Sequence, residues 1–259
     1  MVDALLQIPL LGMEVEPFLV LLVTALAGGA FGAALGALPA FIFTGFVVFL
    51  GEGLAILQRE IGTIEAVPQG ELAAGVTGVI GFGAITGPHI AFAGGVAASA
   101  YAGKKYPEMS PDGWDYHFGK NILYAFGTKP DILAVGAVFG ALGMLIARFS
   151  GAIGLPTDGI ALSVVLTAVI ARVAFGYPLV GKAAGSSLLD MSPFEREEKR
   201  AATDGGEVAA EHADRLATEP WLPHQYKWSG VTAIGLVAGV LAGYIWLPTQ
   251  SIFLGYAIS

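Results

Sequence analysis

The stretch PFLVLLVTALAGGAFGAALGAL occupies residues 17–38 and contains no charged side chain. At about 1.5 Å of rise per residue, a helix of this length reaches roughly 33 Å, which is enough to cross the hydrocarbon core of a bilayer. Its second half is rich in glycine and alanine, and small residues let helix backbones approach one another closely. The stretch therefore predicts a transmembrane helix that packs tightly against its neighbours.

The composition of the whole chain extends this prediction. Of 259 residues, 55% are hydrophobic and 13% are charged, and the mean hydropathy is +0.69. The charged share is about half that of an ordinary soluble domain, so a water-soluble fold cannot hide the apolar surface. We expect an all-α polytopic membrane protein built as a bundle of helices.

The apolar segments come in pairs, and the second member of each pair begins at a proline. Proline is favoured in the first turn of a helix, where its missing N–H has no intrahelical partner to lose. The pattern predicts about eight transmembrane or half-membrane helices in four hairpins with tips at Pro39, Pro88, Pro156 and Pro248. The predicted segments are 17–38, 39–58, 71–87, 88–103, 131–150, 156–177, 229–247 and 248–259.

Two of the segments are short for a full span. A helix over 88–103 or 248–259 falls below the length that crosses the hydrocarbon core with ease. One or both could be half-helices in a re-entrant hairpin, which a membrane tolerates where the turn is buried in protein or lines a watery cavity. The full-span and half-helix alternatives both remain open from the sequence.

The positive charges lie almost entirely between the hairpins. Every Lys and Arg except Arg148 and Arg172 falls in or at the ends of the connections 59–70, 104–130 and 178–228. Cytoplasmic loops carry an excess of Lys and Arg, so we expect the charged loops and both termini on the cytoplasmic side of the cell membrane. Residues 1–17 lack a basic region before their first apolar run and do not resemble a cleaved signal peptide.

Two glycine-rich motifs indicate an internal repeat. GAFGAALG at 29–36 resembles GAVFGALG at 136–143, and a second similarity joins 75–92 to 230–253. The matches predict two membrane halves of two hairpins each, 1–129 and 130–259, the second with a soluble loop at 178–228, although shared glycine-rich composition could also explain part of them. The glycine stripes themselves are typical of helix-packing faces. They comprise Gly28, Gly32 and Gly36 in one half and Gly136, Gly140 and Gly143 in the other.

Polar residues beside the proline tips are the first candidate site. A helix N-terminus presents free N–H groups and partial positive charge, and a histidine there adds a donor or a pH-sensitive charge. Capping of the helix start or a local hydrogen bond at the membrane surface is the simpler explanation of each residue. If the tips converge, they form a polar constriction. The residues that would line it are Thr44, His89, Thr157, Asp158, Thr249 and Gln250.

Glu52 is the second candidate, because it lies in an otherwise apolar segment. An ionisable group inside a span is unfavourable unless it is paired or hydrated, and it marks a functional site by default. The alternatives are that Glu52 reaches water at the interface or pairs with Arg172. Arg148 is placed to pair with Asp158 in the same way.

Composition excludes several classes of function. The chain has no cysteine, so disulfides, thiolate metal sites and cysteine nucleophiles are absent. Its four histidines have no ligand spacing, and no nucleotide-binding, zinc-protease or nucleophile-elbow motif occurs. A net charge of −8 argues against nucleic acid as a partner, and it suits a halophilic source. We expect neither a cofactor nor a metal.

The leading hypothesis is a permease or channel for a small solute or ion, with a pathway between the two halves. Repeated halves commonly place a site at their interface. A membrane-embedded structural subunit of a larger complex is the main alternative. A membrane enzyme would need His89, Asp158 and Glu52 to converge, and we do not expect one. The expected partners are the lipid bilayer, the small solute or ion, and either further copies of the chain or partner subunits.

Overall fold

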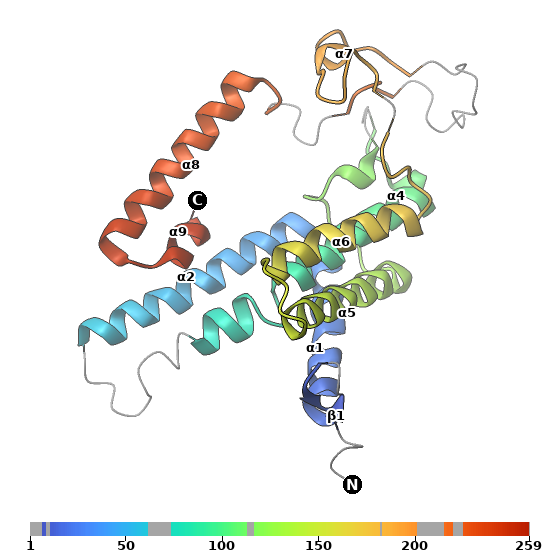
Figure 1. The fold of residues 1–259 in the computed structure, drawn as a ribbon. Helices are drawn as coiled ribbons and strands as arrows, with labels where there is room; N and C mark the ends of the chain where they lie inside the picture. Colours follow the sequence, from blue (N-terminus) through green and yellow to red (C-terminus); the bar gives the residue numbers. More distant parts are fainter. Residues whose placement is uncertain are drawn as a thin grey trace.

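Helices make up 70% of the computed structural model, which describes residues 7–8, 11–61, 74–112, 117–181, 183–200, 215–219 and 225–258. Four helices are long and apolar enough to cross a membrane, namely α1 (Val15–Leu35), α2 (Ala37–Ile61), α5 (Pro130–Ala152) and α8 (Trp228–Thr249). They confirm the predicted class of an α-helical membrane protein (Figure 1).

Shorter elements complete the fold. The apolar α6 (Gly159–Ala174) and α4 (Ala93–Lys105) lie beside α5. Two π-helices, η2 (Ala74–Gly81) and η3 (Pro88–Phe92), precede α4, and α9 (Ile252–Ile258) follows α8. The rest are the antiparallel strands β1 (Gln7–Ile8) and β2 (Met13–Glu14), the single turns η4 (Pro107–Met109) and η5 (Phe118–Lys120), and α7 (Ser192–Glu195).

Glycine contacts hold α1, α4 and α5 together. A Cβ atom at Gly140 would lie 2.6 Å from Cα of Gly29 and 2.7 Å from the backbone oxygen of Ala25. A Cβ atom at Gly94 would lie 2.6 Å from the backbone oxygen of Gly29 and 2.7 Å from that of Gly136. The helices therefore touch through their backbones, which confirms that Gly136 and Gly140 belong to a packing face. Gly28 and Gly32 likewise meet the backbone of 84–91, whereas Gly36 of the same predicted stripe lies in the turn after α1.

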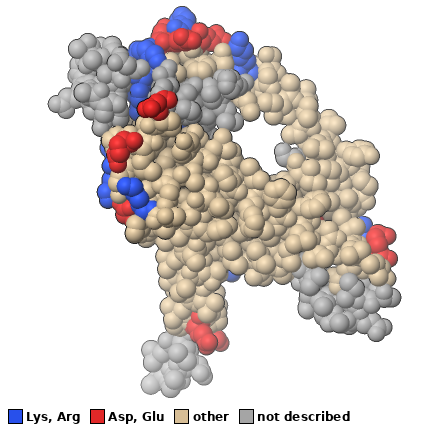
Figure 2. Space-filling view, turned by 180° about the vertical axis from the view of Figure 1, so that it is seen from behind, with Lys and Arg blue, Asp and Glu red and all other residues tan. Residues whose placement is uncertain are grey.

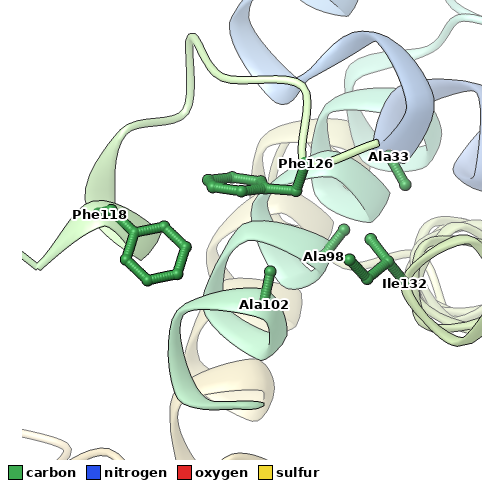
Figure 3. Close-up of a cluster of buried hydrophobic side chains, with 6 residues drawn as sticks. All are labelled: Ala33, Ala98, Ala102, Phe118, Phe126 and Ile132. Carbon is green, nitrogen blue, oxygen red and sulfur yellow. The ribbon is translucent and has the colours of Figure 1, made fainter. Parts of the chain in front are cut away.

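The two ends of this bundle hold different clusters. Close to the C-terminal end of α1, a hydrophobic cluster includes residues of the connection 104–130 (Figure 3). Its buried members are Ala33, Ala98, Ala102, Phe118, Phe126 and Ile132. At the other end, Ala25 packs with Ile90 and Met144, and Phe18 and Leu21 lie against them. Helix α1 therefore runs antiparallel to α5 and begins at the end of the bundle opposite the connection 104–130.

That arrangement corrects one expectation. The tip at Pro39 and the connection 104–130 were predicted to lie on opposite faces. In the structure, the Pro39 tip and this connection lie together. The N–H of Leu38 donates to the backbone oxygen of Ile122 at 2.9 Å. Gly36 makes the turn with φ +95°, which L side chains rarely adopt, and Pro39 falls in the first turn of α2. Helix α2 then leaves the bundle at a large angle to α1 (Figure 1).

The second predicted hairpin is instead one interrupted segment, 74–105. Residues 77–95 run antiparallel to α2, so the described parts of 71–87 and 88–103 do not fold back on each other at Pro88. The irregular break at 82–87 separates η2 from η3, and Pro88 begins η3 as expected. The neighbouring pairs, followed along α2, are Ala37 with Gly95, Thr44 with Thr86, Val48 with Gly81 and Gly51 with Thr77.

The helix boundaries at the last two predicted tips, Pro156 and Pro248, also differ from the prediction. Helix α6 begins at Gly159, three residues after Pro156, because Asp158 is its N-cap. Pro248 lies inside the last turn of α8, and the break comes at Gln250 with a φ of +56°. The seven residues of α9 reach only about 10 Å, so α9 is a half-helix. The internal repeat and the division at residue 129 stay predictions.

Helix α8 stands apart from the bundle. None of its residues is buried, and its contacts are chiefly with α9. Val240 is 71% exposed, and Cβ atoms added at Gly235, Gly239 or Gly243 would meet nothing within 4 Å. The space-filling view shows charged residues at the edges, a broad uncharged surface between them, and an opening beside the arm that holds α8 (Figure 2).

Ion pairs tie the two long connections to each other. The buried carboxylate of Glu219 lies 2.6 Å from Nζ of Lys120, 3.1 Å from Nε of Arg215 and 3.7 Å from the guanidinium of Arg200. Burial lowers the pKa of Lys120 below its ordinary value, and Glu219 acts in the opposite direction. The connections 104–130 and 178–228 therefore meet at one end of the molecule.

A carboxylate-centred turn precedes α7 in the loop 178–228. Asp190 accepts hydrogen bonds from the N–H of Ser186 at 2.7 Å and the N–H of Ser192 at 3.0 Å, and these bonds lower the pKa of Asp190. A lowered pKa means that the turn gains stability above the ordinary aspartate pKa and loses it as the pH falls through the lowered value.

We expect Asp190→Asn to remove this pH dependence, because the neutral amide keeps acceptor capacity but does not titrate. Hydrogen exchange of the Ser186 amide measures the effect. As the pH falls, the exchange rate of this amide in the native protein should rise relative to its intrinsic rate. In the variant, the exchange rate should follow the intrinsic rate alone. Glu195→Gln, in the neighbouring α7, is the matched control, and an identical response in all three proteins would contradict the prediction.

Candidate functional site

Glu52 lies at the meeting point of three separate segments. It belongs to α2, and its two carboxylate oxygens accept hydrogen bonds from hydroxyls on other elements. The hydroxyl of Thr77 in η2 donates to Oε1 at 3.0 Å, and the hydroxyl of Ser251 between α8 and α9 donates to Oε2 at 2.6 Å. The carboxylate is half-buried. We call Glu52, Thr77 and Ser251 the Glu52 cluster.

Both hydroxyls come from irregular backbone. Thr77 lies in a π-helix, where its carbonyl accepts from the N–H of Phe82 at 2.8 Å, five residues ahead. Such π-helical turns are rare and occur frequently at functional sites. Ser251 lies in the break before α9, and its hydroxyl oxygen also accepts from the N–H of Leu254 at 3.0 Å. The cluster therefore joins a helix to two helix interruptions.

The C-terminal end of α8 lies next to the cluster. The guanidinium of Arg59 donates to the backbone oxygen of Thr249 at 3.4 Å. The hydroxyl of Thr249 donates to the backbone oxygen of Ile245 at 2.6 Å, and the side-chain amide of Gln250 donates to that of Leu247 at 2.7 Å. These bonds satisfy carbonyl groups that the end of a helix leaves without partners.

A second polar contact lies nearer the N-terminal end of α2 than Glu52. The buried hydroxyl of Thr44 lies 2.5 Å from the backbone oxygen of Thr86 and 3.1 Å from that of Ala40. The hydroxyl of Thr86 in turn donates to the backbone oxygen of Ile80 at 2.7 Å. The break at 82–87 is therefore held by hydroxyl groups on both of its sides.

Aromatic rings cover the same break and link it to α9. The ring centroid of Phe82 lies 5.2 Å from that of Phe253 and 5.7 Å from that of Tyr256. Phe41 of α2 contacts Tyr256 at 6.1 Å and Phe92 at 5.4 Å. These separations are typical of favourable edge-to-face or tilted aromatic pairs. The half-helix α9 is therefore fixed between α2 and the interrupted segment.

His89 is buried inside the bundle and is not at an outer surface. It is 7% exposed, and its Nδ1 has no hydrogen-bond partner among the described residues. A Cβ atom added at Gly87 would lie 2.9 Å from this nitrogen. His89 therefore covers the start of its own helix, and among the described residues no hydrogen bond joins it to the Glu52 cluster.

Thr157 and Asp158 lie on an exposed turn between α5 and α6. Oδ1 of Asp158 accepts from the N–H groups of Ile160 and Ala161 at 2.8 and 3.2 Å, so the simpler explanation, helix capping, is correct for Asp158. The suggested ion pairs Glu52–Arg172 and Arg148–Asp158 do not form in the described part of the chain. Arg172 instead donates to the backbone oxygen of Pro178 at 2.6 and 3.0 Å.

The structure thus brings together only some of the predicted site residues. Glu52, Thr249 and Gln250 lie at one place, and Thr44 lies with the break at 82–87. Thr77, Ser251 and Arg59 had not been predicted. A hydroxyl in an apolar segment can bond back to its own helix, so its sequence position alone does not mark a site. Within the described ranges, no group of three or more His, Cys, Asp or Glu residues could hold a metal ion.

Comparison with known proteins gives one match. No curated protein and no solved structure matches the chain. Residues 11–259 match the family described as a family of unknown function, DUF7973. The match covers nearly the whole length, including both segments that contact Glu52, and the chain therefore belongs to this family.

Proposed function

We propose that the chain is a membrane permease or channel for a small solute or ion. The pathway follows α2, between the interrupted segment 74–105 on one side and the α8–α9 break on the other. The supporting observation is the Glu52 cluster, in which a carboxylate inside a membrane-spanning helix is held by hydroxyls from two helix interruptions. These contacts join Glu52 and Thr77 of the predicted first half to Ser251 of the predicted second half.

The physical argument concerns the free energy of an ionisable group in a membrane. A charged side chain in a span is unfavourable by about 3 kcal/mol or more unless water, an ion or a partner is present. No Lys or Arg forms an ion pair with Glu52 in the described residues. Interrupted helices supply free carbonyl and N–H groups at membrane depth, which transporters use to bind substrates and ions.

The same proposal assigns an orientation. The connections 104–130 and 178–228 carry most of the Lys and Arg residues and meet at Glu219, so we place them in the cytoplasm. Because α1 begins at the opposite end of the bundle, this orientation would put its start on the outer face, whereas the sequence led us to expect the N-terminus on the cytoplasmic side.

Flux measurements test the proposal. The full chain is reconstituted in liposomes, and uptake of a panel of inorganic cations, inorganic anions, amino acids and small polyols is compared with uptake by protein-free liposomes. We expect at least one solute to enter more than about tenfold faster with protein, a difference of about 1.4 kcal/mol in barrier height. Folded protein that moves no solute of any class would count against a permease.

A structural subunit is the second candidate, and the exposed α8 favours it. The helix has no buried residue, and Gly235, Gly239 and Gly243 form an open face of the kind that packs against other membrane helices. Purification in mild detergent from the native host separates the possibilities. A different protein at a fixed ratio supports the subunit, whereas only copies of this chain support the homo-oligomer expected of a permease.

A further inference from the structure

We propose that the Glu52 cluster binds one monovalent alkali cation. This inference deepens the proposed permease, on which it rests for its physiological meaning, by identifying the chemical class of an ion that the pathway takes up. The site would consist of the Glu52 carboxylate, whose Oε1 lies 3.0 Å from the hydroxyl oxygen of Thr77 and whose Oε2 lies 2.6 Å from that of Ser251, together with these two hydroxyl oxygens.

The charge of the cluster sets the charge of its ligand. Glu52 is the only acidic residue in the cluster, and the nearby Arg59 donates to the backbone oxygen of Thr249 and to the side chain of Glu60. One negative charge in a membrane-spanning helix is neutralised by one monovalent cation. A divalent ion usually needs further carboxylates, and the described residues contain no group of three or more acidic or histidine ligands.

The ligand atoms set the type of cation. All of the side-chain groups are hard oxygens, which bind alkali and alkaline-earth ions in preference to soft transition metals. Each hydroxyl has one hydrogen and two lone pairs. When a cation enters, the Thr77 and Ser251 hydroxyls rotate so that a lone pair replaces the hydrogen that now faces Glu52, and each hydroxyl oxygen moves away from the carboxylate to make room for the ion.

The C-terminal end of α8 also lies beside the cluster. A helix C-terminus carries about half a negative charge, and the last residue of α8, Thr249, lies two positions before Ser251, although the guanidinium of Arg59 at the Thr249 carbonyl offsets part of that charge. Broken helices in secondary transporters bind coupling ions with carbonyls and helix C-termini in this manner. The bound ion would hold three segments together, namely α2, η2 and the start of α9, so it would stabilise the folded state.

Thermal unfolding of the purified full chain in detergent tests the site. Chloride salts of Na⁺, K⁺ or Li⁺ replace choline chloride at constant ionic strength, so that general salt effects cancel. We expect the unfolding midpoint to rise and then saturate with at least one alkali cation. At a concentration of 100 times the dissociation constant, the ratio of folded to unfolded protein should increase about 100-fold.

Three variants make the assay specific. Glu52→Gln keeps the shape and one acceptor oxygen but removes the charge, and it should lose the cation response. Ser251→Ala should weaken the response, whereas Glu60→Gln, an exposed carboxylate on the same helix, should respond like the native protein. The readout is the response to cation, so a lower starting midpoint in a variant does not affect it.

The outcomes separate this inference from the proposed function. An equal response in native protein and Glu52→Gln, or no response to any alkali cation, would overturn the cation site. A midpoint that depends on pH through Glu52 but not on cations would replace the cation with a proton. Solute flux that persists without a cation response leaves the permease intact. A cation response without flux of any solute supports the site and counts against the permease.

Discussion

Replacement of Gly140 by leucine is expected to prevent assembly of the bundle. A Cβ atom at this position would lie 2.6 Å from Cα of Gly29 and 2.7 Å from the backbone oxygen of Ala25. Both atoms belong to the α1 backbone, so no side chain can move aside to make room. Overpacking in a well-packed interior typically destabilises by about 1–3 kcal/mol, and a forced separation of two helices lies at or above the upper end.

The measurement is the yield of monodisperse protein and its unfolding midpoint in detergent. Gly151→Leu is the matched control, because Gly151 lies on the same helix and a Cβ atom there would meet nothing within 4 Å. We expect the control to resemble the native protein and Gly140→Leu to give little or no folded protein. Equal midpoints in the two variants would mean that α1 and α5 do not touch through their backbones.

Replacement of Glu52 by glutamine is expected to lower solute flux at least about tenfold, which corresponds to about 1.4 kcal/mol. The amide has nearly the shape of the carboxylate and retains an acceptor for the hydroxyl of Thr77 or Ser251. It lacks the negative charge that makes an ionisable group inside a span useful for moving an ion or a polar solute. The variant should therefore fold and fail to transport.

The initial rate of uptake into liposomes, at matched protein content, measures this loss. Glu60→Gln removes a carboxylate from the exposed end of the same helix, and we expect it to leave the rate unchanged. A Glu52→Gln protein that transports at the native rate would remove Glu52 from the pathway. The residues of the break at 82–87, especially Thr86 and its partner Thr44, would then be the next candidates.

The sequence predicts well those features that depend on local physics. Pro88 begins η3 and Pro39 lies in the first turn of α2, because a proline at a helix start loses no hydrogen bond. Asp158 caps α6 as a short acidic side chain should. The same rule is wrong for Pro248, because the helix passes through it and ends two residues later, at Gln250 in a left-handed conformation.

The candidate site was less predictable, because it depends on contacts between distant residues. Glu52 is recognisable from its charge alone, and Thr249 and Gln250 from their place beside a proline. Thr77 and Ser251 lie 25 and 199 residues away from Glu52 along the chain, and nothing in their local sequence indicates the contact. The continuous path of 74–105 along α2 also depends on a π-helix and an irregular break, which have no clear sequence signal.

The peripheral place of α8 has a consequence for biogenesis. Chains are synthesised from the N-terminus, and the segments that form the glycine-packed bundle all precede residue 181. They can enter the bilayer and associate while the ribosome is still translating the loop 178–228. Helix α8 and the half-helix α9 then dock onto a surface that already presents Glu52. The order of synthesis therefore matches the order of packing, and the Glu52 cluster is completed last.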